Sequence, residues 1–262
     1  MPDAPYESAS TSAPVVGVER NGHVALVELR RPPHNFFDVA MIAALADAFQ
    51  ALERDDGCRA VVLASQGKSF CAGADFSGGR RNDRGALYTQ GARLFAMRKP
   101  VVAAVQGPAI GGGLGVALVA DFRVTCPQAR FSANFTRLGF HPGFGLSYTL
   151  PRLVGQQQAA LLFYTGRRID GTQAHAIGLA DELADSPEQT RERALALAAE
   201  IAASAPIAVE SVRATLRAGL HQQVEAAIAH ENAQQQLHFE TADCREGLAA
   251  SLQRREPVFT RS

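Results

Sequence analysis

The stretch QGPAIGGGLGVAL, residues 106–118, places five glycines inside the most apolar part of the chain. A glycine weakens a helix or strand by about 0.5–1 kcal/mol relative to alanine, so five of them need a compensating use. The surrounding residues 101–120 carry no charge and contain GxxxG, but Gln106, Pro108 and the glycines would break a helix that spans a membrane. The stretch therefore predicts a buried strand followed by a buried helix.

Three uses of these glycines come into consideration: a phosphate-binding loop, close packing of a helix on its neighbours, and an oxyanion hole. The spacing argues against the first, because Gly111 and Gly113 would need a third glycine where the chain has Val116. Close packing remains open. In the third use, unpaired N–H groups at a helix start stabilise a negatively charged oxygen, and the absence of a Cβ lets a carbonyl group approach them. A second glycine-containing turn, KSFCAGADF (68–76), follows the preceding predicted strand.

The flanking segments predict an α/β fold with a mainly parallel sheet. Alternating apolar runs surround Asn21-Gly22, which is a strong hairpin signal. Strands that alternate with helices form parallel sheets, whose strands end at one shared edge, where ligands tend to bind. From about residue 156 the chain is predicted to be nearly all helical. The expected helices are 39–52, 85–98 and 110–120, and the expected buried strands are 59–65, 100–107 and 121–126.

Composition narrows the class of partners. The 262 residues are 47% hydrophobic, which suffices for a sizeable core, and 26 Lys and Arg balance 26 Asp and Glu. This balance gives no reason to expect a nucleic acid or a membrane surface as partner. Four scattered cysteines without a CxxC pair argue against a metal site or disulfides, and they favour a reducing compartment such as the cytoplasm. Residues 1–14 lack the pattern of a signal peptide and predict a disordered tail.

Four motifs in register carry a family resemblance. They are RPPHNFFD (31–38), GKSFCAGADF (67–76), KPVVAAVQGPAIGGGLGVALVADFRV (99–124) and FSANFTRLGFHPGFGLSYTLPRLVG (131–155). Together they resemble the crotonase, or enoyl-CoA hydratase/isomerase, superfamily, from about residue 15 to the C-terminal REPVF. The resemblance implies a spiral of ββα units in a core domain over residues 15–205. It also implies a helical trimerisation region over residues 206–262, in a homotrimer or hexamer.

The same resemblance implies a site and a substrate. The substrate is expected to be an acyl-CoA thioester, with no cofactor apart from the coenzyme A that the substrate carries. The oxyanion donors are expected to be the backbone N–H groups of Ala74 and Gly112. Arg31 is a candidate phosphate contact, or simply a solvated charge. The full set of expected contacts to the coenzyme A and acyl groups is Arg31, Phe70, Ala72, Gly73, Asp75, Gly111, Gly115 and Phe135.

The resemblance fails at the acid–base residues. Two glutamates are expected in hydratases of this family, and their positions carry Gly115 and Phe135, neither of which can ionise. His141 is the leading substitute, because histidine titrates near neutral pH; alternatively it only stabilises a turn before Pro142. Weaker candidates are Asp75, Asp83, Arg84, Tyr88, His34 and Asp38, and the surface is predicted for His221, His230 and His238.

Two functions therefore stay open. The first is an enzyme that hydrates, isomerises, decarboxylates or hydrolyses acyl-CoA thioesters through an anion at the thioester oxygen. The second is an acyl-CoA-binding protein that kept the fold and lost the acids. The retained AGAD and GGG turns are compatible with both functions.

Overall fold

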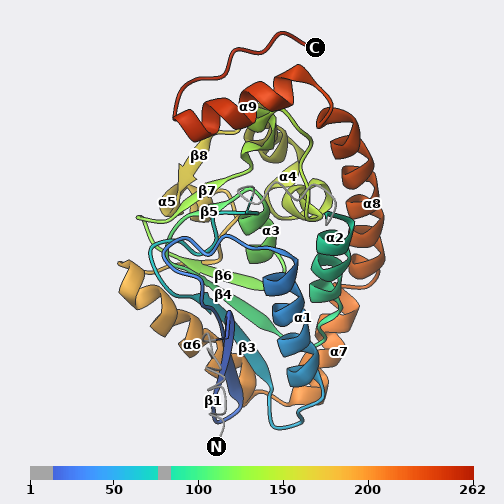
Figure 1. Ribbon diagram of the computed structural model, residues 1–262. Helices are drawn as coiled ribbons and strands as arrows, with labels where there is room; N and C mark the ends of the chain where they lie inside the picture. The colour runs from blue at the N-terminus through green and yellow to red at the C-terminus, as the bar shows by residue number, and fades with distance from the viewer. Residues whose placement is uncertain (1–13, 76–83) are drawn as a thin grey trace, which may run out of the picture.

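The computed structural model describes residues 14–75 and 84–262, which form two sheets surrounded by helices (Figure 1). The chain opens with strands β1 (Val16–Asn21) and β2 (Val24–Leu29), which pair antiparallel around Gly22. Gly22 has φ of 58°, a conformation that glycine adopts without strain. The predicted hairpin is confirmed.

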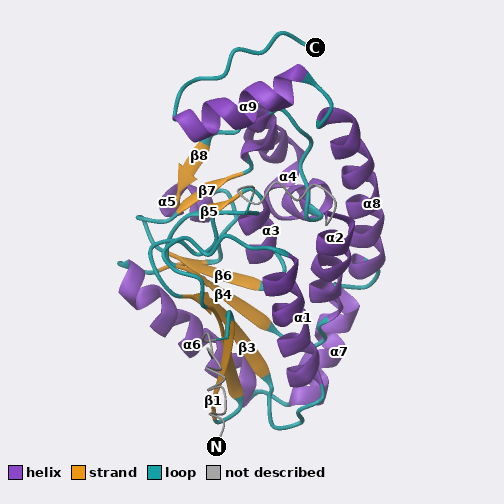
Figure 2. Ribbon diagram, in the orientation of Figure 1, coloured by secondary structure: helices purple, strands orange, loops and turns teal. Residues whose placement is uncertain are grey.

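The main sheet has six strands in the order β1-β2-β3-β4-β6-β9, and every pair after the hairpin is parallel (Figure 2). Its further strands are β3 (Ala60–Ser65), β4 (Val101–Val105), β6 (Phe122–Thr125) and β9 (Glu182–Leu183). The predicted α/β fold with a mainly parallel sheet is confirmed.

Both faces of this sheet are covered by helices. Val61 and Leu63 of β3 belong to the large core that also contains Met41 and Leu45 of helix α1 (Val39–Glu53). The alternate side chains of β3 and β4 enter a second core beneath helix α6 (Pro187–Ala203). Since successive side chains of a strand point to opposite faces, burial on both sides explains why β3 is apolar almost throughout.

A second, three-stranded sheet joins β5 (Ala109–Ile110), β7 (Arg130–Ser132) and β8 (Arg168–Asp170). The prediction of a helix over residues 110–120 is wrong at both ends: Ile110 belongs to β5, which pairs with β7, and helix α3 covers only Gly112–Ala117. Between them Gly111 has φ of 56° and ψ of −122°, which lies outside the helical region. This residue therefore sets where the helix begins.

The remaining described elements are mostly helical. They are α2 (Arg84–Arg93), the 3-10 turns η2 (Leu94–Ala96) and η3 (Asn134–Leu138), α4 (Leu146–Thr165), α5 (Gly171–Ala176), α7 (Pro206–Leu216), α8 (Leu220–His238) and α9 (Ala242–Gln253). Strands β8 and β9 interrupt the part predicted to be nearly all helical. Each has two or three residues and is defined by its pairing partner, so local periodicity does not reveal it.

The C-terminal helices α7, α8 and α9 follow one another along one side and one end of the molecule (Figure 1). Their role in trimerisation stays a prediction. Among the described residues, no single helix is long and apolar enough to cross a membrane, and one sharply bent pair, α6 with α7, meets only the length and composition criteria. The uncharged residues 101–120 fold as β4, β5 and α3, as the strand-then-helix interpretation requires.

Close packing accounts for part of the glycine cluster. A Cβ built on Gly113 would lie 2.0 Å from the carbonyl oxygen of Cys71, and one on Gly107 would lie 2.2 Å from that of Lys68. Both contacts are with backbone atoms, which cannot move without displacing the loop over residues 66–75. Only glycine fits at these two positions.

We expect Gly113→Ala to lower the free energy of unfolding by more than about 3 kcal/mol, because the added methyl group must displace backbone rather than a side chain. Gly85→Ala is the matched control: Gly85 lies in helix α2, and among the described residues no atom from outside its own helical turn lies within 4 Å of a Cβ built on it. Because Gly85 is the second residue of α2, that change should alter the free energy of unfolding by no more than about 0.5 kcal/mol. Urea unfolding of the two variants measures both effects, and similar stabilities would contradict the close-packing argument.

Candidate functional site

Two loops meet at the carboxyl edge of the main sheet. Strands β3 and β4 are parallel neighbours that end at Ser65 and Val105, so the loops that follow them leave the same edge. The loops pair through Cys71 N–H, which donates to Pro108 O at 3.0 Å, and Ile110 N–H, which donates to Cys71 O at 3.0 Å. The two glycine-containing turns of the sequence are therefore brought together.

The turn that contains Ala74 approaches the start of α3 at this junction. Gly112 is the first residue of α3, so its N–H has no partner within the helix, and neither it nor the Ala74 N–H bonds another described residue. The backbone of Phe37 is hydrogen-bonded to the residues on either side of Ala74: its N–H donates to Gly73 O, and its carbonyl accepts from Asp75 N–H, both at 2.9 Å. A Cβ on Gly73 would lie 3.9 Å from the nitrogen of Gly112. Convergence of the two N–H groups on one oxygen stays a prediction.

Aromatic rings surround the start of α3. The atom nearest to a Cβ built on Gly112 is Cζ of Phe37, at 2.6 Å, and the atoms nearest to one built on Gly115 belong to Phe144, at 2.8 Å. A Cβ on Gly111 would lie 3.8 Å from Cζ of Phe135. Sequence reasoning named Phe135 but missed Phe37 and Phe144, whose only signals were an aromatic pair before Asp38 and a phenylalanine between two glycines.

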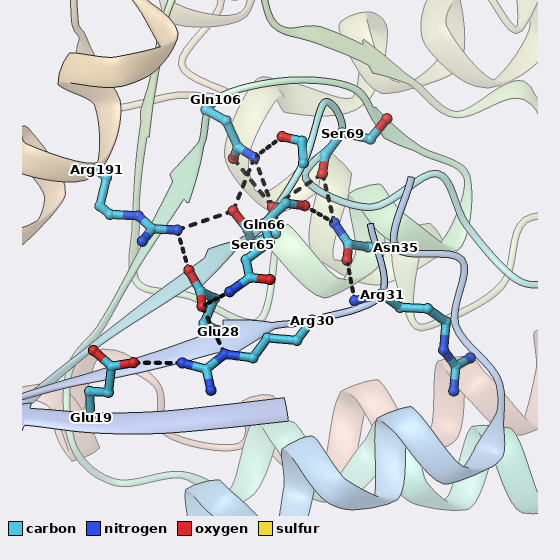
Figure 3. Close-up of polar contacts among 11 residues, drawn as sticks. Glu19, Glu28, Arg30, Arg31, Asn35, Ser65, Gln66, Ser69, Gln106 and Arg191 are labelled. Carbon is cyan, nitrogen blue, oxygen red and sulfur yellow. Dashed lines mark hydrogen bonds and ion pairs between the residues drawn. The ribbon is translucent and has the colours of Figure 1, made fainter. Parts of the chain in front are cut away.

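A buried asparagine holds the loops in place (Figure 3). The side chain of Asn35 is fully buried; its Nδ2 donates to Gln66 O at 2.7 Å and Ser69 O at 2.9 Å, and its Oδ1 accepts from Arg31 N–H at 2.9 Å. Asn35 has φ of 50°, a left-handed conformation in which asparagine is enriched. One side chain therefore joins the loop that contains Phe37 to the loop that contains Ala74.

A charged cluster lies next to this asparagine (Figure 3). Glu28 is buried and accepts hydrogen bonds from Arg30, at 2.9 Å, from Gln66, at 2.8 Å, and from Arg191 of α6. Burial opposes ionisation of Glu28, but these hydrogen bonds outweigh it and hold the pKa of its carboxyl below the ordinary value. The cluster ties α6 to the strand end from which the loop over residues 66–75 departs.

Several other predicted contacts lie on the same two loops. Arg31 is half-buried, forms an ion pair with Asp38 at 3.1 Å and donates to Phe36 O at 3.2 Å. Asp38 caps the start of α1 by accepting a hydrogen bond from Met41 N–H, so it has a structural role. His34 has a structural role too, because its Nδ1 lies 3.1 Å from the hydroxyl of Ser69. Phe70 and Gly73 are buried, Ala72 is half-buried and Asp75 is exposed. Contact of these residues with coenzyme A stays a prediction.

His141 is held by helix α8. Its backbone N–H donates to Nδ1 of His238 at 3.1 Å, its carbonyl accepts from Gln235 at 2.8 Å, and its ring packs edge-on against that of His230. Its own Nδ1 lies 2.9 Å from the carbonyl oxygen of Pro142. These contacts favour the structural interpretation of His141, and its catalytic role stays a prediction.

The other titratable candidates are dispersed. The Tyr88 hydroxyl is bonded to Gln235, while Asp83 and the side chain of Arg84 lie outside the described residues. His230 is exposed, whereas His238 is half-buried rather than at the surface, and burial and the neighbouring His141 lower its pKa. Within residues 14–75 and 84–262, no three His, Cys, Asp or Glu side chains are placed to bind a metal ion.

Glu231 is a buried acid that sequence reasoning missed. It is fully buried on α8 and accepts from Gly145 N–H at 2.7 Å, Ser147 N–H at 2.8 Å and Ser147 Oγ at 2.6 Å, so it caps the start of α4. Burial raises the pKa of Glu231 to about 7, although its three donors oppose the rise. Together, Glu231, Gln235 and His238 fix both ends of the loop over residues 141–147.

The raised pKa of Glu231 predicts a pH-dependent stability. Between its ordinary value of 4.5 and about 7, the folded protein keeps a proton that the unfolded chain releases. The free energy of unfolding therefore falls as the pH rises through this window, by an amount on the order of 3 kcal/mol. Glu231→Gln lacks this contribution, so the stability advantage of the wild type over the variant should shrink by that amount between pH 4.5 and 7.5.

Urea unfolding at several pH values measures this difference. Glu192→Gln replaces an exposed glutamate of helix α6 and should leave the pH dependence of the wild type unchanged. A wild-type advantage over Glu231→Gln that is the same at every pH would contradict the prediction.

The fold and the junction of glycine turns define an α/β protein in which a backbone N–H at the start of α3 bonds no other described residue. The family model that matches, over residues 19–262, is enoyl-CoA hydratase/isomerase. The crotonyl-CoA hydratase of Syntrophomonas wolfei is 33% identical, with 92% of this chain and 96% of that protein covered. The 2,3-dehydroadipyl-CoA hydratase of Escherichia coli is also 33% identical, with coverages of 92% and 97%.

Solved structures agree with this match. The crystal structure of an enoyl-CoA hydratase/isomerase from Pseudoalteromonas atlantica has a TM-score of 0.86 and 30% identity, with 94% of this chain and all of that chain covered. An enoyl-CoA hydratase from Mycobacterium avium has a TM-score of 0.84 and 26% identity, with coverages of 95% and 100%. The chain belongs to the enoyl-CoA hydratase/isomerase family, in the crotonase superfamily, whose members act on acyl-CoA thioesters.

Proposed function

We propose that this protein is an enzyme that forms a thioester enolate of an acyl-CoA and stabilises it with the N–H groups of Ala74 and Gly112. The observation that carries this proposal is the junction of the two turns, where Gly73, the chain neighbour of Ala74, approaches the nitrogen of Gly112, and neither the Ala74 nor the Gly112 N–H bonds another described residue. Two such donors aimed at one oxygen stabilise a negative charge that develops there in the transition state.

The surroundings of these donors strengthen their effect. The rings of Phe37 and Phe144 lie 5.6 Å apart, centroid to centroid, and are the side chains nearest to Gly112 and Gly115. In an apolar environment with little water, the attraction between each N–H group and a negatively charged oxygen is stronger, because less solvent screens the charge. Loss of one donor of this kind typically costs about 10²–10³ in turnover.

The same surroundings disfavour fast hydration. Addition of water to a double bond requires a titratable group that moves protons, and neither Gly115 nor Phe135 can provide one. A Cβ at position 115 would also collide with Phe144, so the space of a longer side chain is already filled. This observation favours a second candidate reaction, loss of carbon dioxide from a carboxylated acyl-CoA. That reaction leaves the bonding electrons on the enolate and needs no side-chain base.

A non-catalytic acyl-CoA-binding protein is the alternative from another class of function. The absence of a carboxyl group at positions 115 and 135 would be neutral for binding. Turnover of enoyl-, malonyl- and β-ketoacyl-CoA thioesters distinguishes the two, because a binding protein retains affinity for these thioesters without converting any of them.

Replacement of one donor tests the oxyanion hole. Gly112 is the first residue of α3, a position where proline is tolerated, so Gly112→Pro removes the N–H with limited damage to the helix. Turnover of whichever thioester reacts should fall by about 10²–10³. Since any Cβ at this position approaches Phe37, Gly112→Ala is the control, because it adds the Cβ and keeps the N–H. Equal losses in the two variants would show that crowding, not the donor, is responsible.

The chemistry is tested against a relative. Hydration of crotonyl-CoA by this protein should be slower than by the crotonyl-CoA hydratase of Syntrophomonas wolfei, by about 10²–10⁴, which is the usual contribution of positioned acid–base groups. Parallel assays with crotonyl-CoA and malonyl-CoA, read by chromatography of the products, measure both reactions. Equal hydration rates for the two proteins would mean that another group moves the protons.

A further inference from the structure

Phe144 has an unusual backbone for its side chain. Its φ of 63° lies in the left-handed region, and its ring is buried. For a bulky residue this conformation is strained, and such strain persists only where the surrounding structure enforces it. Gly143 and Gly145 flank it, so the turn already contains residues that adopt this region freely. A phenylalanine between them needs a reason.

The ring fills the space between helices α3 and α2. It lies 2.8 Å from a Cβ built on Gly115 of α3 and 3.2 Å from one built on Gly91 of α2, and its centroid is 5.6 Å from that of Phe37. Gly115 is on the same face of α3 as Gly112, three residues or about 4.5 Å further along the axis. The ring therefore closes the space about one helical turn beyond the N–H of Gly112.

Helix α8 holds the ring in this position from both sides. Before Phe144, Gln235 and His238 bond the backbone of His141; after it, Glu231 accepts from the N–H groups of Gly145 and Ser147. These three side chains are spaced four and three residues apart, so they share one face of the helix. These hydrogen bonds, between side chains of α8 and the backbone on both sides of Phe144, keep Phe144 in its strained conformation.

A groove with a volume of about 710 Å³ lies between α1, α2 and α8. Its lining includes Tyr88 and Ala92 of α2 and Ile228 of α8, and the Tyr88 hydroxyl would lie 2.5 Å from a Cβ on Gly143. Gly91, on which the Phe144 ring packs, is the chain neighbour of Ala92. Removal of the ring would therefore open the space beside α3 toward α2 and this groove.

We propose that Phe144 determines acyl-chain specificity: its ring closes the acyl end of the site about one helical turn beyond Gly112 and restricts the substrate to short acyl chains, such as butyryl. This inference rests on the proposed function, because it requires the thioester oxygen to be bound at Gly112. Glu231, Gln235 and His238 are positioning residues that act through Phe144.

Binding of saturated acyl-CoAs tests this inference without turnover. Titration calorimetry with CoA and with acetyl-, butyryl-, hexanoyl- and octanoyl-CoA should show the wild type preferring butyryl-CoA to octanoyl-CoA. Phe144→Gly removes the ring and relieves the backbone strain, and it should bind octanoyl-CoA at least about tenfold more tightly than the wild type. Each methylene group that the opened space buries is worth about fourfold in affinity. Affinity for CoA itself should not change.

Phe95→Ala is the matched control, because Phe95 is a buried ring in the turn η2, outside the site. It should lose stability yet keep the wild-type order of affinities. If Phe144→Gly does not fold in a thermal unfolding test, Phe144→Leu should shift the preference to hexanoyl-CoA. A folded Phe144 variant with the wild-type order, or a wild type that prefers octanoyl-CoA, would overturn the inference alone. A folded wild type that binds no acyl-CoA would overturn the proposed function with it.

Discussion

The close approach of Gly113 to the carbonyl group of Cys71 is the constraint on which the site depends. A single methyl group at position 113 would lie 2.0 Å from that oxygen, so helix α3 can start where it does only because this position has no side chain. The approach places Gly112 beside Gly73 and lets the loop over residues 66–75 pair with β5. The parallel sheet delivers the two loops to one edge, but the missing Cβ permits their contact.

Buried polar side chains then keep these loops in conformations that they would not adopt alone. Asn35 and Phe144 both have positive φ. The side chain of Asn35 donates to backbone carbonyls of the loop over residues 66–75, and the carboxylate of Glu231 accepts from the N–H of Gly145, next to Phe144. An unpaired backbone group in such a site would cost about 1–3 kcal/mol, so Asn35 and Glu231 stabilise the fold by satisfying groups that no strand or helix can satisfy. The apolar rings next to Gly112 are consequently presented on a backbone with little freedom.

Membership of a family with a shared fold does not by itself establish the reaction. The N–H groups of Ala74 and Gly112 are provided by the backbone, so they survive any change of side chain that leaves the turns intact. The groups that move protons are side chains, and here Gly115 and Phe135 occupy the positions where the resemblance leads one to expect acids. The chemistry of this protein therefore depends on what replaced those acids, and the structure shows aromatic rings beside Gly112 and Gly115 of α3.

The sequence by itself determined the hairpin at Asn21-Gly22, the parallel α/β fold and the two glycine-containing turns, because each rests on a local pattern of turn residues or apolar periodicity. It also pointed to the family through four motifs in register. The short strands β5, β7, β8 and β9 escaped it, as did the shortening of α3 to Gly112–Ala117, because these elements exist only through pairing with distant segments. Only the tertiary structure decided that Phe37 and Phe144 pack against the glycines of α3 and that Glu231 is buried against the start of α4. Glu231 and Gly145 are 86 residues apart in the chain, and no local pattern records a contact across such a separation.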